Sequence, residues 1–70
     1  MKIKVNVTEI SKLGFDGGRS RIVMNPSINS DLNKELWINE PDGTIEFNFD
    51  KVANADLFEL GEYIVEFTKA

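Results

Sequence analysis

The sequence contains no cysteine and no histidine, and these two absences narrow the range of possible functions. Without cysteine there can be no disulfide bond, no thiolate nucleophile and no thiolate metal ligand. Without histidine the chain lacks the side chain most often used as a general base at neutral pH, and also the commonest zinc ligand. The serines therefore have no histidine to activate them as nucleophiles. We expect no enzymatic activity, no cofactor and no metal centre.

A long apolar run is also absent, because no stretch approaches the roughly 18 residues that a membrane-spanning helix needs. The start, MKIKVNV, is too short and too polar for a secretory signal. Together with the lack of cysteine, this predicts a cytoplasmic protein.

The chain is small, with 70 residues and a mass of 7.9 kDa. A single domain of this size buries roughly 60% of its surface on folding, which is near the lower limit for folding without disulfides or metal. Either a core rich in large rings compensates, or a second subunit supplies the missing burial. Five phenylalanines, one tryptophan and one tyrosine favour the first explanation. A homo-oligomer remains the alternative.

The formal net charge is −4, and the charge is unevenly distributed along the chain. Residues 1–25 carry five basic and two acidic side chains, whereas residues 26–70 carry three basic and ten acidic ones. A polarised surface of this kind could steer a charged partner. If strands from the two halves interleave in space, the asymmetry disappears.

Alternation of polar and apolar residues predicts five strands, because successive side chains of a strand point to opposite faces. The strands are expected at residues 2–10, 19–25, 35–39, 44–49 and 62–68. In the second of these, Ile22 and Met24 share one face and Arg21 and Val23 share the other. In the fourth, Ile45, Phe47 and Phe49 are expected to face the core.

Glycine, proline and asparagine mark the connections between these strands. Residues 11–18 form a glycine-rich loop in which Gly17-Gly18 can adopt the positive φ angles of a hairpin turn. Pro41-Asp42-Gly43 is typical of a type I turn followed by a left-handed glycine, which makes 35–49 a hairpin. Residues 26–34 are polar, with at most one helical turn near Ser30. A short helix is expected to begin at Asp50 and to end at Gly61.

The predicted order is therefore β-β-β-β-α-β, with one polar and one apolar face on nearly every strand. This pattern is typical of antiparallel sheets. Five short strands and one helix before the last strand close most economically into a partly open antiparallel barrel, which is OB-like or SH3-like. The whole chain, 1–70, is expected to form this single domain.

From residue 33 onward the chain resembles a group of small proteins encoded by tailed bacteriophages, whose C-terminal half reads approximately NKxFW…PxG…FxxGKxYxVxFTxA. The matching positions are Asn33, Lys34, Trp37, Pro41, Gly43, Ile45, Glu46, Phe58, Gly61, Tyr63, Val65, Phe67, Thr68 and Ala70. Leu36 stands where the pattern has phenylalanine, and Glu62 replaces its basic residue. The resemblance implies a viral accessory protein and assigns no site residue.

A protein-contact surface is expected around Trp37. If Leu36 and Ile38 face the core, Trp37 points outward beside Val23 and Ile64, and the three side chains form an apolar patch. Tryptophan is enriched among the residues that dominate binding energy at interfaces. If the face assignment is reversed, or if residues 26–34 cover the ring, this patch does not exist.

A second candidate site is basic and lies around the sequence GFDGGRSR. Its candidate nucleic-acid or phosphate contacts are Lys2, Lys4, Phe15, Arg19 and Arg21. Basic side chains beside an aromatic ring are what single-strand binders require, although the net negative charge argues against this function. Glu40, Asp42 and Glu46 lie around one turn and could offer oxygen ligands to calcium, but turn formation explains this segment better.

The sequence therefore favours a non-enzymatic protein-interaction module, such as a phage accessory or inhibitor protein that acts by occupying a surface. Its partner would be a host or phage protein, or a second copy of the chain. The alternatives are an OB-like binder of single-stranded nucleic acid or nucleotides, and a structural component of a virion.

Overall fold

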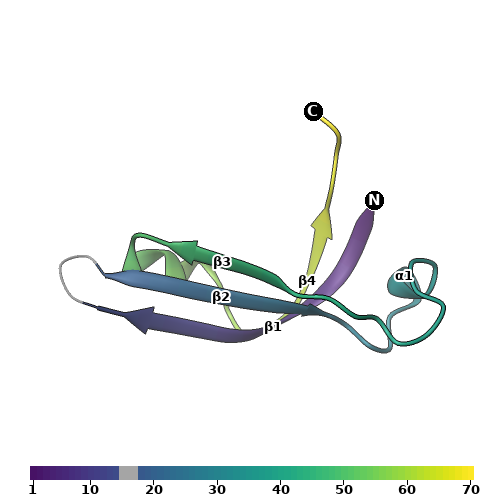
Figure 1. Ribbon diagram of the computed structural model, residues 1–70, viewed down its shortest axis with the longest axis horizontal. Coiled ribbons are helices and arrows are strands. Elements are labelled where there is room, and N and C mark those ends of the chain that lie inside the picture. Colours follow the sequence, from purple (N-terminus) through teal and green to yellow (C-terminus); the bar gives the residue numbers. More distant parts are fainter. Residues whose placement is uncertain (15–17) are drawn as a thin grey trace.

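The computed structural model describes residues 1–14 and 18–70, and its main feature is one four-stranded antiparallel sheet with the order β3-β2-β1-β4 (Figure 1). The strands are β1 (Lys2–Leu13), β2 (Arg19–Pro26), β3 (Ile45–Phe49) and β4 (Gly61–Glu66). A short helix, α1 (Asp31–Lys34), follows β2, and a 3₁₀ helix, η1 (Val52–Leu57), connects β3 with β4. The predicted mainly β, antiparallel architecture with a short helix before the last strand is confirmed.

The long strand β1 organises the sheet, because it pairs with β2 on one side and with β4 on the other. Its register with β2 shifts between Val7 and Glu9, so Thr8 is the extra residue of a β-bulge. The bulge changes the alternation, and Ile10 therefore joins the same face as Val5 and Val7. Without it, Ile10 would point to the other face of the sheet.

The sheet has one apolar face, on which the hydrophobic core forms. Val5, Val7, Ile22 and Met24 are buried at its centre. We call this side of the sheet the apolar face, and the opposite side the outer face. The strand residues of the apolar face that surround the buried centre are Ile3, Ile10, Ile45, Phe47, Phe49, Tyr63 and Val65.

One end of the apolar face is covered by η1. The Ser20 hydroxyl on β2 donates a hydrogen bond of 2.9 Å to the carbonyl of Lys51, and Lys12 on β1 pairs with Asp56 at 2.8 Å. Ala55 is buried beneath the helix. Because η1 has only six residues, it leaves much of the face open, and Phe47 remains 44% exposed. The predicted core position of Phe47 is therefore correct in face but wrong in burial.

A buried side chain, Asn33 of α1, attaches the segment after β2 to β1. Its amide oxygen accepts a hydrogen bond from the Lys4 amide at 2.8 Å, and its amide nitrogen donates to the carbonyls of Lys4 at 2.7 Å and Ser27 at 3.0 Å. Lys4 lies just beyond the point where β2 stops pairing with β1. The Asn33 side chain thus continues the hydrogen bonding of the sheet where a strand has ended.

The predicted strand at 35–39, the third of the five, is wrong, and so is the predicted hairpin over 35–49. Residues 35–39 form turns and bends after α1, and residues 41–44 have no regular structure before β3 begins. Gly43 has a φ of 147°, so the glycine is in a backbone conformation that other residues avoid, but there is no partner strand for it to connect. The sheet is open, with β3 and β4 at its two edges.

The connections also differ from their predicted form. The expected helix from Asp50 is the 3₁₀ helix η1, whose N-cap is Lys51, and Gly61 begins β4 rather than ending the helix. The expected loop 11–18 is shorter, because β1 continues to Leu13. Gly18 has the predicted positive φ, at 59°, whereas Gly17 lies outside the described residues.

The molecule is flat and long, with extents of 44 × 27 × 16 Å. Its radius of gyration is 13.8 Å, compared with roughly 11 Å for a compact domain of this length. In Figure 1 the paired ends of β1 and β4 rise away from the rest of the sheet and carry both termini. A single sheet with little cover accounts for this shape.

We predict that Asn33→Ala lowers the free energy of unfolding by about 1–3 kcal/mol, because it leaves the Lys4 amide and the Ser27 carbonyl without their partner, whereas the Lys4 carbonyl keeps its hydrogen bond from the Ser27 amide. Chemical denaturation at a fixed protein concentration measures this loss. Asn39→Ala is the matched control, since Asn39 is exposed in the connection before β3. Equal stabilities of the two variants would show that the Asn33 hydrogen bonds contribute nothing to folding.

Candidate functional site

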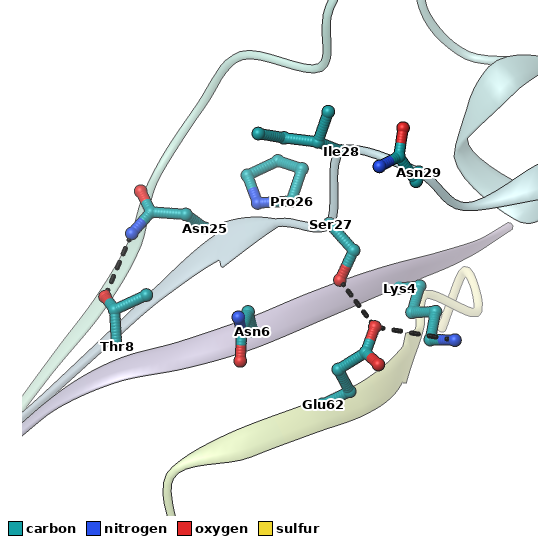
Figure 2. A pocket seen from close by; sticks show the side chains of 9 residues that line it. All are labelled: Lys4, Asn6, Thr8, Asn25, Pro26, Ser27, Ile28, Asn29 and Glu62. Carbon is teal, nitrogen blue, oxygen red and sulfur yellow. Dashed lines mark hydrogen bonds and ion pairs between the residues drawn. The ribbon is translucent and has the colours of Figure 1, made fainter.

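A polar pocket of about 470 Å³ lies on the outer face, where β1 and β4 meet the chain leaving β2 (Figure 2). The residues that line it are Lys4, Asn6, Thr8, Asn25, Pro26, Ser27, Ile28, Asn29 and Glu62. The pocket forms because β2 ends at Pro26 and the chain turns away there, while β1 and β4 continue. Its walls are therefore β1, β4, the end of β2 and the turn that follows β2.

The polar groups of this pocket are largely paired with one another. One carboxylate oxygen of Glu62 accepts a hydrogen bond from the Ser27 hydroxyl at 3.1 Å and lies 3.4 Å from the Lys4 ammonium group. The Asn25 amide donates to the Thr8 hydroxyl at 3.0 Å (Figure 2). A ligand would have to replace these bonds, so the pocket has little free capacity to bind one.

The structure places Trp37 differently from the predicted contact surface. Leu36 is 41% exposed and Ile38 is fully exposed, whereas Trp37 is half-buried. The predicted face assignment is therefore reversed. The reason is that 35–39 is not a strand, so the alternation of these three residues does not divide them between a core and a solvent face.

Val23 and Ile64 do lie on the outer face, but they are not neighbours. Val23 on β2 is opposite Glu9, and Ile64 on β4 is opposite Lys4. These two partners on β1 are separated by roughly 15 Å along the strand. Polar residues of β1 occupy the space between them, so the predicted apolar patch of Trp37, Val23 and Ile64 is not assembled.

The basic candidate residues share the outer face with an equal number of acids. The basic side chains on its strands are Lys2, Lys4, Arg19 and Arg21, and the acidic ones are Glu9, Glu46, Glu62 and Glu66. Each of these acidic residues lies beside a basic residue on a neighbouring strand. The two halves of the chain interleave, and the charge asymmetry of the sequence disappears on this face. Phe15, the aromatic member of the predicted basic site, lies outside the described residues.

Arg21 is at the centre of the best-defined charge cluster. Its guanidinium donates a hydrogen bond of 2.8 Å to Glu46, and its Nε lies 3.7 Å from Glu9. The pKa of Glu46 is lowered, first by the hydrogen bond that the Asn48 amide donates at 2.9 Å and then by the bond from Arg21. The pKa of Arg21 is raised, mainly by its bond to Glu46. These groups are solvent-exposed, so the cluster fixes side-chain positions rather than adding much stability.

Four aromatic rings form a row across the apolar face, and this is the most distinctive surface of the molecule. Phe47 and Phe49 of β3 have ring centres 5.8 Å apart, Phe49 and Phe58 are 6.4 Å apart, and Phe58 and Tyr63 of β4 are 6.3 Å apart. We call these four residues the aromatic row. Because β3 and β4 are the edge strands, the row spans the full width of the sheet.

The aromatic row is exposed at both ends, with Phe47 at 44% and Tyr63 at 37% exposure. The Glu59 amide donates a hydrogen bond of 3.0 Å to the Tyr63 hydroxyl, which fixes the orientation of that ring. Leu57 and Leu60, on either side of Phe58 in the sequence, are 74% and 68% exposed. Exposed aromatic and aliphatic groups next to one another are typical of contact surfaces.

The alternation of 44–49 predicts that Phe47 and Phe49 face the core, and the structure confirms this face but leaves Phe47 exposed. Alternation indicates which way these side chains point, whereas the area covered by η1 decides whether they are buried. The sequence carried no signal of the exposure, because the helix that it predicted is longer than η1.

The calcium ligands considered in the sequence, Glu40, Asp42 and Glu46, are not brought together. In the part of the chain that the structure describes, no group of three or more acidic side chains is arranged to hold a metal ion.

No family model matches this chain, and no curated protein or solved structure is similar to it. The resemblance to small phage proteins therefore stays a prediction. Among the described residues, neither helix is long and apolar enough to cross a membrane.

We predict that the carboxyl of Glu46 titrates below the ordinary glutamate pKa, and that Asn48→Ala raises its pKa. Because the pKa is lower in the folded chain, Glu46 stabilises the fold above its unfolded-state pKa, and this contribution is lost as pH falls through the folded-state pKa. A carboxyl-detected NMR titration from neutral pH to about pH 2 measures both values. Asn39→Ala is the control, and an unchanged Glu46 pKa in Asn48→Ala would contradict the assigned cause.

Proposed function

We propose that this chain is a non-enzymatic protein-interaction module that binds through its apolar face. The observation that carries the proposal is the aromatic row, whose ends Phe47 and Tyr63 remain exposed on a face that η1 covers only in part. Burying aromatic rings of this kind in a partner contributes strongly to binding free energy. The proposed protein-contact surface is thus the apolar face and not the patch that was expected around Trp37.

The charge distribution supports an apolar rather than an ionic mode of recognition. On the outer face the basic and acidic strand residues are equal in number and lie beside each other. On the apolar face Lys12 is the charged strand residue in the described chain, and it is paired with Asp56. The expected partner surface is therefore apolar and of low charge, and electrostatic steering contributes little to the encounter.

The nucleic-acid alternative is less well supported. Proteins that bind single strands on a sheet place aromatic rings and basic side chains on the same face, so that bases stack while phosphates are neutralised. Here the aromatic row and the basic residues Lys2, Lys4, Arg19 and Arg21 are on opposite faces. An OB-like barrel with nucleic acid on this sheet would lack phosphate contacts beside the stacked bases.

In keeping with the resemblance to small phage proteins, the module we propose is an accessory or inhibitor protein in the cytoplasm of an infected cell. The partner that covers the apolar face would be a host or phage protein, or a second copy of the chain. A virion component would use the same apolar face to contact its neighbours, so this alternative differs in partner rather than in surface.

We predict that Phe47→Glu abolishes partner binding, because it places a charge at an exposed end of the aromatic row. Immobilised native chain and variants are incubated with bacterial lysate, and the captured polypeptides are identified by mass spectrometry. Ile64→Glu is the matched control, since Ile64 is 63% exposed but lies on the outer face. A polypeptide retained by the native chain and by Ile64→Glu, but not by Phe47→Glu, supports the proposal.

Two outcomes contradict it. A polypeptide captured equally well by all three chains, or lost only with Ile64→Glu, would place the contact elsewhere. A salt-sensitive mobility shift of labelled single-stranded oligonucleotides, absent for Arg21→Ala, would favour the nucleic-acid alternative instead.

A further inference from the structure

The isolated chain exposes more surface than a folded domain of its mass should. Its accessible surface is 5490 Å², about 1,100 Å² more than the roughly 4,400 Å² expected for a compact monomer of 7.9 kDa. Relative to an extended chain of about 11,500 Å², folding buries only about 52% of the surface, compared with about 60% for domains of similar length. The isolated chain therefore buries too little of its own surface.

Part of the exposed apolar surface lies on one side of the sheet. In the described chain only five hydrophobic residues are buried, and four of these, Val5, Val7, Ile22 and Met24, form the centre of the apolar face. Around them Phe47, Tyr63 and the neighbours of Phe58 are exposed. The molecule is 16 Å thick in its shortest dimension, as expected for one sheet with a partial cover rather than for two packed layers.

We infer that the apolar face binds a second copy of this chain, with the two sheets packed face to face about a two-fold axis. This inference rests on the proposed function and names the occupant of the same surface. A standard interface covers about 800 Å² per partner, and removing that area raises the buried fraction to about 59%. The second copy thus supplies the burial that the monomer lacks.

A second copy is favoured over an unrelated protein because the burial that the monomer lacks is needed for folding itself. A domain of 70 residues without disulfides has little stability to spare, so the missing burial has to be available whenever the chain itself is present. Only another copy of the chain meets this condition without a second component. In an obligate dimer of this kind, folding and association are one reaction.

The chemistry of the apolar face permits contact with itself. Two-fold symmetry brings identical patches together, so charged residues in the patch would meet like charges. Among the described strand residues of this face only Lys12 is charged, and Asp56 neutralises it at 2.8 Å. The aromatic row reaches both edges of the sheet, so its exposed rings, Phe47 and Tyr63, can contact the second copy where η1 leaves the face open.

The native chain, studied by sedimentation equilibrium, is expected to have twice the mass of one chain. Its melting temperature is expected to rise over an about 100-fold increase in concentration, because dimerisation stabilises the folded state by mass action. Phe47→Glu should raise the dimer dissociation constant by about 30-fold or more, whereas Ile64→Glu should change it by less than about threefold. The melting experiment needs no variant, so it remains decisive if Phe47→Glu does not fold.

The contact surface is identified directly by isotope-filtered NMR on a mixture of labelled and unlabelled native chains. Intermolecular contacts at the rings of Phe47 and Tyr63 support the inference. A native chain with the mass of one copy and a concentration-independent melting temperature overturns it. So does a dimer whose intermolecular contacts are at Ile64, on the outer face.

Failure of this inference can be told apart from failure of the proposed function. A monomeric native chain that still loses a captured polypeptide in Phe47→Glu leaves the interaction module intact and assigns its face to a different partner. If Phe47→Glu neither weakens the dimer nor changes capture, the apolar face is not a contact surface, and both proposals fall.

Discussion

The structure depends on one constraint: a sheet with a single apolar face and only six helical residues to cover it. A sheet of four strands presents far more apolar area than η1 can bury, so covering one end of the face leaves the other end in contact with water. The flat shape, the large accessible surface and the exposed ends of the aromatic row all follow from this mismatch. The same mismatch makes the apolar face the best candidate for contact with another protein.

The sequence predicted four of the strands and their faces, because alternation is a local property that does not depend on the rest of the chain. It failed at 35–39, where Leu36, Trp37 and Ile38 imitate a strand but follow a helical turn. Beyond the end of β2, the Asn33 amide rather than a strand from that segment bonds to Lys4. The buried Asn33 could not be recognised, because Lys4, to which it makes two of its three hydrogen bonds, is 29 residues away in the sequence.

The candidate sites were less predictable than the strands, because a site depends on how elements meet. Val23 and Ile64 are on the predicted outer face, yet the strand register separates them. The bulge at Thr8 determines which residues of β1 continue the apolar face, and no pattern in the sequence indicates where the bulge occurs. Whether Phe47 is a core residue or a surface residue depends on the length of η1, which was expected to be a longer α-helix.

The two faces of the sheet differ in what they can still bind. On the outer face, Arg21 bonds to Glu46 and Lys4 lies near Glu62, so a new charged partner would have to compete with contacts that already exist. On the apolar face, the rings at the ends of the row compete only with water, and releasing that water is favourable. Because strand pairing brings residues of both signs together, the acidic second half of the sequence serves to balance the basic strands β1 and β2. On the proposed contact surface, specificity therefore comes from the shape of the aromatic row, because Lys12 is the charged strand residue of that face in the described chain and it is paired with Asp56.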